Sequence, residues 1–207
     1  ASLSGYVFGR LRFPGRALLM LGILAISYFP PAAFVIPLFQ AFAGNAPIRV
    51  PFTSIPLFTP PRLLNTPGSM VLPFSALFMP LSIFILTTFY GQIPNGLEDA
   101  ARVEGTTRLG ALFRVIMPLS APGVATAGIL TFITVYTEFF FSFLMTGNSA
   151  AEWAPVVDGV IAFQTQYTVR YDLQAAASLI AIVPVAILVV VAQDKIISGL
   201  TQGALKE

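Results

Sequence analysis

The sequence predicts an all-α fold, a polytopic bundle of transmembrane helices. Of its 207 residues, 56% are hydrophobic and only 10% are charged, whereas about 25% of the residues in a soluble domain are charged. The mean hydropathy is +0.83. Four segments are apolar over at least the roughly 20 residues that a helix needs to cross a bilayer. They cover about residues 17–43, 70–90, 121–145 and 173–193.

Several classes of function are disfavoured by what the sequence lacks. Cys and His are absent, which excludes disulfides, Cys-based metal sites and His as a metal ligand or general base. The net charge is only +2 without a basic run, so nucleic acid is not an expected partner. No Gly-x4-Gly-Lys-Ser/Thr motif occurs, so the chain should not bind ATP through a P-loop. We expect no enzyme activity, cofactor or metal in this chain.

The first segment, residues 1–8, is apolar but too short to cross a bilayer. We therefore expect a longer protein whose start lies upstream. Gly5 and Gly9 form a Gly-x3-Gly pair, which lets helices approach closely, although small residues in any packed helix give the same pattern. Three prolines interrupt the span at 17–43: Pro30, Pro31 and Pro37. They predict a kinked helix that packs inside the bundle.

A proline-rich loop at 44–69 follows, and it is unusually apolar for a loop. Two interpretations stay open: the loop packs on a partner, or it lies at the bilayer interface. The second span at 70–90 comes next. No repeat or change in composition divides the chain, so we treat 1–207 as a single transmembrane domain.

Between the second and third spans lies a polar stretch, residues 94–118, that we interpret as two short helices joined at a glycine. Asn95 is a good N-cap with Glu98 at capping-box spacing. Glu98 and Arg102 form an i,i+4 pair, and Gly105 suits the left-handed residue that ends a helix. The second helix has a threonine cap, an apolar stripe and a terminating proline: Thr106 or Thr107, then Leu109, Leu112, Phe113, Ile116, Met117 and Pro118.

This stretch resembles the cytoplasmic signature loop of ABC-importer permease subunits. The family pattern is Glu-Ala-Ala, three residues, Gly, nine residues and Ile-x-Leu-Pro. The spacings match throughout: Asp99-Ala100-Ala101, Gly105, then Val115-Ile116-Met117-Pro118. Asp99, Val115 and Met117 depart from the usual Glu, Ile and Leu, and Glu104 replaces the usual Asp. A generic amphipathic loop between two spans is the alternative interpretation.

The resemblance implies that the first short helix, the coupling helix, docks into a cleft on a separate ATPase subunit that holds ATP and Mg. The residues that it assigns to this coupling are Glu98, Asp99, Ala100, Ala101, Glu104, Gly105, Phe113 and Pro118. It further implies a second permease subunit, an ATPase dimer and an extracytoplasmic solute-binding protein as partners. The family usually has six spans, so the chain is expected to be an N-terminally truncated permease that lacks the first span and most of the second.

Charge bias predicts the orientation in the cell membrane. Eight of the eleven Lys and Arg residues lie in the segments before the first span, between the second and third spans, and after the fourth. The positive-inside rule places these segments in the cytoplasm, including the C-terminus.

The third span carries a polar stripe at i, i+3, i+7 and i+11, formed by Thr131, Thr134, Glu138 and Ser142. A carboxylate at mid-bilayer costs about 3 kcal/mol on insertion scales, so Glu138 should face a cavity or a partner. Two interpretations stay open. The stripe lines a substrate path in which Glu138 accepts hydrogen bonds from sugar hydroxyls, or the hydroxyls join helices while Glu138 holds a subunit interface.

The segment at 146–171 occupies the position of a family loop that reaches toward the solute-binding protein. Gln164, Gln166 and Tyr167 are the candidate contacts, and an interfacial helix lying on lipid is the alternative. The fourth span at 173–193 is capped by Asp172 and contains Pro184, where we expect a kink, and a polar tail follows.

The tail resembles the ending Gly-Leu-Thr-x-Gly-Ala-x-Lys-Gly of carbohydrate, maltose-type importers, and only Glu207 departs from it. There the tail contacts the ATPase dimer, which assigns Gly199, Thr201, Gly203 and Lys206 to that contact. We therefore predict a permease subunit of an importer for sugars or sugar-like solutes. The alternatives are a permease for another solute, or an ion-coupled secondary transporter that uses Glu138.

Overall fold

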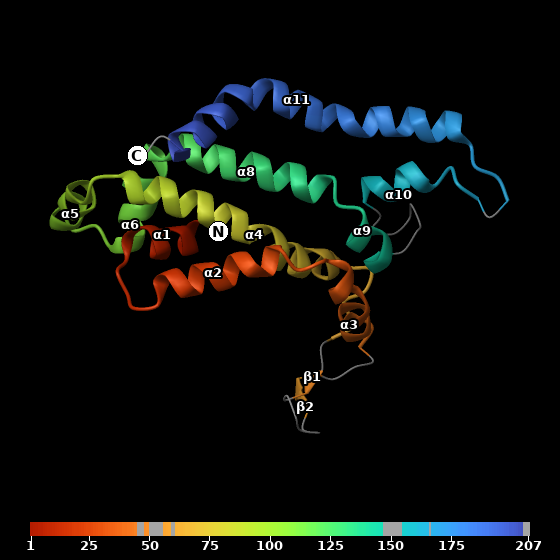
Figure 1. Cartoon of the computed structure of the whole chain (residues 1–207), viewed down its shortest axis with the longest axis horizontal. Helices are drawn as coiled ribbons and strands as arrows, with labels where there is room; N and C mark the ends of the chain where they lie inside the picture. The colour runs from red at the N-terminus through yellow and green to blue at the C-terminus, as the bar shows by residue number, and fades with distance from the viewer. Residues whose placement is uncertain (45–47, 50–55, 59–60, 147–154, 166, 205–207) are drawn as a thin grey trace. The chain divides into compact units, whose positions relative to one another are not determined.

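The computed structural model describes residues 1–44, 48–49, 56–58, 61–146, 155–165 and 167–204 (Figure 1). In this part the chain is mostly helical, which confirms the predicted fold class. The proline-rich segment contributes a short antiparallel pair of strands, β1 (Ile48–Arg49) and β2 (Pro56–Phe58).

The helices follow one another along the chain. They are α1 (Ser2–Arg10), α2 (Arg16–Ser27), α3 (Ala32–Phe42), α4 (Pro67–Gln92), α5 (Asn95–Val103), α6 (Arg108–Ala111), the π-helical η1 (Leu112–Ile116), α7 (Met117–Leu119), α8 (Ala121–Tyr136), α9 (Phe140–Met145), α10 (Val156–Ile161) and α11 (Tyr171–Ala204).

Two of these helices, α4 and α11, are each long and apolar enough to cross a membrane. This confirms the helices expected at 70–90 and 173–193, and both are longer than predicted. Helix α11 contains Pro184 and continues to Ala204, through most of the segment expected to be a polar tail. Within the described residues, the number of candidate spans rises to four if each of two bent helix pairs counts as one.

The other two predicted spans are interrupted. The chain breaks between α2 and α3 at residues 28–31, where Pro30 and Pro31 lie, as the prolines predicted. The expectation of one helix over 121–145 is wrong, because α8 ends at Tyr136 and α9 begins only at Phe140. No proline or glycine marks this second break.

The described residues pack into two compact units, and α4 and α11 contribute to both. The first unit takes its residues from 1–28, 78–135 and 187–204, and the second takes them from 29–77 and 136–186. The first unit contains the polar loop between α4 and α8. Its buried core cluster comprises Tyr6, Leu86, Tyr90, Leu112, Ile116 and Ala127.

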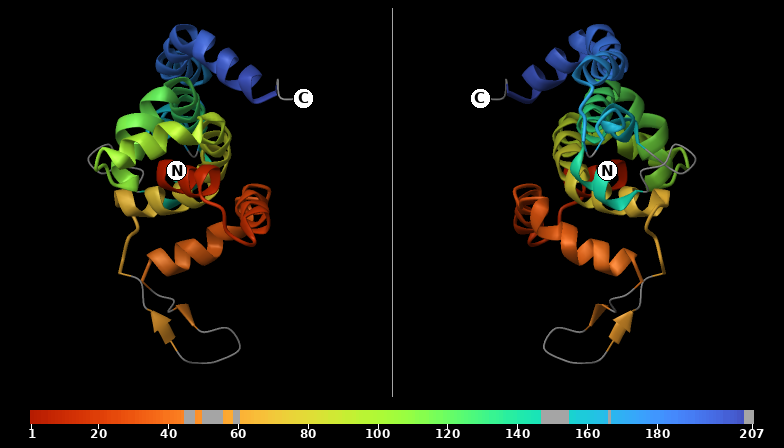
Figure 2. Two further views of the ribbon diagram at one scale, coloured as in Figure 1. Left: turned by 90° about the vertical axis from the view of Figure 1, so that its left-hand side faces the viewer. Right: turned by 90° about the vertical axis from the view of Figure 1, so that its right-hand side faces the viewer.

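Glycines allow the helices of the first unit to approach closely. A Cβ atom on Gly5 would lie 2.7 Å from the Cβ of Leu86, and one on Gly9 would lie 2.9 Å from the carbonyl oxygen of Thr87. These contacts bring α1 directly against α4 (Figure 2). The Gly-x3-Gly pair therefore serves close helix packing, one of the two interpretations of its spacing.

Gly123 provides the sharpest test of this packing. A Cβ atom there would lie 2.2 Å from the ring of Phe89, whereas Gly128 on the same helix has no neighbour within 4 Å. We expect Gly123→Ala to destabilise the protein by about 1–3 kcal/mol through overpacking. Gly128→Ala should instead raise stability by about 0.5–1 kcal/mol, since alanine favours helix. Thermal melts in detergent measure both changes in stability. Equal melting temperatures for the two variants would contradict the close contact between Gly123 and Phe89.

Candidate functional site

The polar loop between α4 and α8 folds into two short helical segments joined at Gly105, as predicted. Gly105 has φ +88°, the left-handed conformation that glycine adopts without a steric cost. The hydroxyl of Thr107 then accepts a hydrogen bond from the backbone N–H of Gly110 at 3.1 Å, which confirms the threonine cap of the second segment. The α6–α7 segment, Arg108–Leu119, meets α8 at an angle of 86°.

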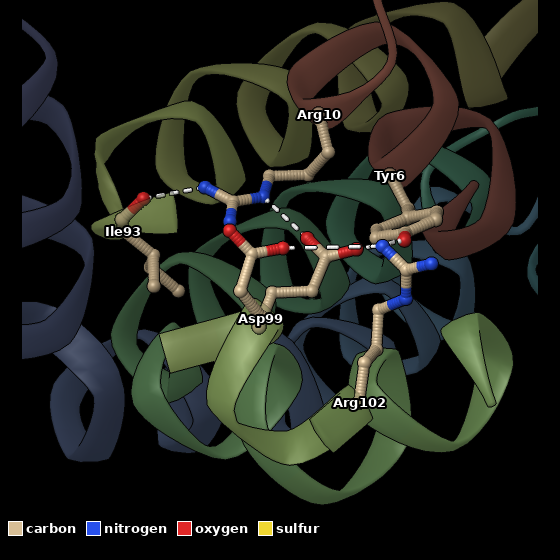
Figure 3. Close-up of polar contacts among 6 residues, drawn as sticks. Tyr6, Arg10, Ile93, Asp99 and Arg102 are labelled. Atoms are coloured by element: carbon tan, nitrogen blue, oxygen red, sulfur yellow. Dashed lines mark hydrogen bonds and ion pairs between the residues drawn. The ribbon is translucent and has the colours of Figure 1, made fainter. Parts of the chain in front are cut away.

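The inner side of α5 is fastened to the end of α1 through Glu98, which is only 8% exposed. Its Oε1 accepts a hydrogen bond from the Tyr6 hydroxyl at 2.6 Å, and its Oε2 accepts one from Nε of Arg10 at 2.9 Å. Arg10 also donates to the carbonyl oxygen of Ile93, just before α5. Figure 3 shows Tyr6 and Arg10 reaching from α1 toward α5. We call Tyr6, Arg10, Ile93 and Glu98 the Glu98 clamp.

The clamp holds a charged pair away from water. The side chain of Arg10 is 3% exposed and that of Glu98 is 11% exposed. Burial alone would raise the pKa of Glu98, but the hydrogen bonds from Tyr6 and Arg10 and the charges of Arg10 and Arg108 lower it on balance. Glu98 is therefore ionised at neutral pH, and each charge depends on the other for its stability.

Two predictions about α5 are wrong. The helix begins at Asn95 with Pro94 as its N-cap and has no side-chain cap, so there is no capping box. Arg102 pairs with Asp99 across 3.9 Å on the exposed side of the helix, not with Glu98. The reason is tertiary: the carboxylate of Glu98 is taken up by donors on α1, 88 and 92 residues earlier in the chain.

The outer side of α5 is open in this chain. Val103 is 89% exposed on this side, whereas Leu97 is 44% exposed and borders a pocket with Phe89 and Leu119. Most of the other residues assigned to coupling are exposed as well, and Ala101 is partly buried. The exposed ones are Asp99, Ala100, Glu104, Gly105, Phe113 and Pro118. Only Glu98 among the assigned residues is buried.

The apolar stripe of the second segment is divided between core and surface. Leu112 and Ile116 are fully buried, whereas Leu109 and Phe113 are more than half exposed. The π-helical turn at Leu112–Ile116 changes the register of the side chains, so one face predicted from a 3.6-residue period becomes two. Pro118 does not stop the segment, because helical structure continues through Leu119.

The polar stripe predicted for the third span does not form one helix face, because α8 ends between its second and third members. Thr131 on α8 hydrogen-bonds to Ser82 on α4, which supports the interpretation that this hydroxyl joins helices. The hydroxyl of Thr134 donates to the carbonyl oxygen of Leu130 on its own helix at 2.8 Å. Ser142 lies on α9 and is buried.

Glu138 lies in the break between α8 and α9. Its carboxylate accepts backbone N–H hydrogen bonds from Phe140, Phe141 and Ser142 at 2.8–3.2 Å. It therefore supplies acceptors to the start of α9, where the first N–H groups have no partner within the helix. Within the described residues, no group of three His, Cys, Asp or Glu side chains could hold a metal ion.

The remaining predicted contacts lie in exposed or undescribed segments. Gln164 is exposed and forms an isolated β-bridge with Val169, and Tyr167 is 88% exposed. Gln166 and Lys206 lie outside the described residues. Gly199, Thr201 and Gly203 belong to the helical backbone of α11.

Comparisons of the sequence with known proteins identify the family. The family described as binding-protein-dependent transport system inner membrane component matches residues 1–199. The sulfoquinovosyl glycerol transport system permease protein SmoH of Agrobacterium fabrum is 37% identical over 99% of this chain and 65% of its own length. The trehalose/maltose permease protein MalG of Thermococcus litoralis is 33% identical over the whole chain and 68% of its own length.

A third relative, the trehalose transport system permease protein SugB of Mycobacterium tuberculosis, is 33% identical over 99% of this chain and 69% of its own length. The chain thus spans about two thirds of the length of these relatives. The signature loop and the sugar-transport relatives lead to one conclusion, which confirms the predicted resemblance. The chain belongs to the family of inner membrane components of binding-protein-dependent transport systems.

Proposed function

We propose that this chain acts in the permease subunit of an ATP-driven importer for sugars or sugar-like solutes. The support is twofold: the family match, and relatives named as permeases for trehalose, maltose and sulfoquinovosyl glycerol. The proposal includes a cell-membrane location with the C-terminus in the cytoplasm, as the positive charges favour.

The observation that carries the proposal is the two-sided character of α5. Its inner side is fixed by the buried Glu98 clamp, and its outer side leaves Val103 almost fully exposed. A short helix that is anchored on one side and unpartnered on the other is suited to receive another protein. The proposed occupant is a cleft on a separate ATPase subunit, which would hold ATP and Mg while this chain holds neither.

The clamp gives this docking a mechanical consequence. Because Arg10 contacts both Glu98 on α5 and the carbonyl oxygen of Ile93 before it, a displacement of α5 acts on α1 directly. α1 in turn packs without a gap on α4 through Gly5 and Gly9. Movement of the ATPase would thus reach an apolar helix long enough to span the membrane, as rigid-body rocking in alternating access requires.

Transport by the reconstituted complex tests the proposal. The full-length protein is purified with its co-purifying subunits, placed in liposomes and supplied with ATP and the solute-binding protein. We expect ATP-dependent uptake of radiolabelled trehalose or maltose, and no uptake of glutamine or phosphate. Uptake of glutamine or phosphate in place of the sugars would show that the solute is not a sugar. Uptake of any solute driven by an ion gradient without ATP would overturn the importer class.

A further inference from the structure

The second unit contains a cavity whose described lining includes one residue already given a role, Gln164, the candidate contact for the solute-binding protein. It lies where α9 and α10 pack together and has a volume of about 540 Å³. Its lining combines aromatic, aliphatic and polar side chains: Phe139, Phe143, Asp158, Ile161, Ala162 and Gln164. A concave site that combines apolar side chains with a few polar groups is the usual form of a small-molecule site.

Asp158 in this cavity has an incomplete set of hydrogen-bond donors among the described residues. The residue is 7% exposed, and its Oδ1 is buried without a partner among the described residues. Its Oδ2 lies 3.0 Å from the hydroxyl of Thr146, which also lies 2.6 Å from the carbonyl oxygen of Ser142. A hydroxyl has one hydrogen, so it serves only one of these acceptors at a time. An ionised carboxylate can accept about four hydrogen bonds, so most of its capacity is unused.

The aromatic side of the cavity offers an apolar surface in addition to the polar Asp158. The rings of Phe139 and Phe143 are stacked, with centroids 5.5 Å apart and planes 14° from parallel, and both rings are partly exposed. Such a surface suits the apolar face of a sugar ring. The amide of the exposed Gln164 can donate to one hydroxyl and accept from another.

We propose that this cavity binds a polyhydroxylated solute, with Asp158 accepting hydrogen bonds from its hydroxyls and the Phe139–Phe143 pair packing on its ring. The proposal rests on the proposed function and adds a solute site in this subunit between α9 and α10. It also accounts for a buried carboxylate that would otherwise cost stability, because a bound solute supplies the donors that the described residues do not.

Ligand-induced thermal shift and transport kinetics of Asp158→Asn in the assembled complex test this site. The amide keeps the size of the side chain but loses a charged acceptor. We expect the KM for trehalose or maltose uptake to rise about 10-fold to 100-fold, the range for hydrogen bonds to a charged group. The rise in melting temperature on adding the sugar should be lost. Asp172→Asn is the matched control, an exposed carboxylate in the same unit that should change neither value.

Phe143→Leu is a second variant that keeps the carboxylate and removes the aromatic surface, and it should raise the KM for sugar while leaving the ATPase rate unchanged. If wild-type complex transports sugar and both variants retain the wild-type KM and thermal shift, the cavity is not a solute site and only this inference fails. If choline raises the melting temperature at a lower concentration than sugar does, the cavity binds a cation instead and the proposal is overturned. Absence of sugar uptake by the wild type would overturn the proposed function itself.

Discussion

Glu98→Ala is expected to abolish ATP-driven transport while the subunits still reach the membrane. The substitution removes both oxygens that hold Tyr6 and Arg10, and it leaves the guanidinium of Arg10 buried without a counter-charge. Removal of one partner of a buried ion pair costs about 3–5 kcal/mol. At about 3 kcal/mol, the ratio of molecules with α5 attached to α1 to molecules with α5 detached falls by about a hundredfold. Sugar uptake into proteoliposomes measures the loss.

A double-mutant cycle with Arg10→Ala separates the clamp from a general loss of folding. If the two side chains act as a pair, Glu98→Ala and Arg10→Ala together should destabilise the protein by clearly less than the sum of the single changes. Thermal melts of the four proteins supply the comparison. Full uptake by Glu98→Ala, with an unchanged melting temperature, would show that the clamp does not fix α5.

Gly105→Val is the second substitution for which we expect a large effect, an uncoupling of ATP hydrolysis from transport. Gly105 has φ +88° and no atom within 4 Å of an added Cβ. The cost is therefore conformational: about 1–2 kcal/mol for an ordinary residue in this region and more for a β-branched one. The junction between α5 and α6 would relax to another geometry and move the outer side of α5. Uptake per ATP hydrolysed should fall by at least about tenfold.

A graded series at the same position provides the control. Asn adopts the left-handed conformation more readily than Ala or Val, so coupling should decrease in the order Gly, Asn, Ala, Val. Gly96→Ala, on α5 itself and equally free of neighbours, should retain coupling because Gly96 has no positive φ. Loss of coupling that does not follow this order would refute a role for the backbone conformation.

The features that the sequence predicted well are local ones. The left-handed turn at Gly105 and the cap at Thr107 depend on single residues and their nearest neighbours. The apolar helices α4 and α11 depend on composition over about 20 residues. The spacing of the signature loop likewise predicted the family, which the match over residues 1–199 confirms.

The features that the sequence did not predict depend on distant partners or on small changes in helix register. Glu98 has a plausible local partner in Arg102, and nothing within residues 94–105 points to Arg10 on α1. The break after Tyr136 lies in continuous apolar sequence, and its only local sign is the polar pair Thr137-Glu138, in which Glu138 supplies acceptors to α9. The π-helical turn at Leu112–Ile116 has no pattern that a 3.6-residue period would detect.

Site-specific photo-crosslinking from Val103 tests the central claim most directly, namely that the outer side of α5 receives a separate ATPase subunit. The chain contains no cysteine, so within this sequence a thiol-reactive benzophenone attaches only at the residue introduced by Val103→Cys. The same labelling of the wild-type complex accounts for cysteines of the partner subunits. Val191→Cys on α11, which is also highly exposed, is the matched control. In the intact complex we predict a crosslink from position 103 to the ATPase and none from position 191. Crosslinks from position 103 to lipid alone, with the ATPase still bound to the complex, would contradict the account.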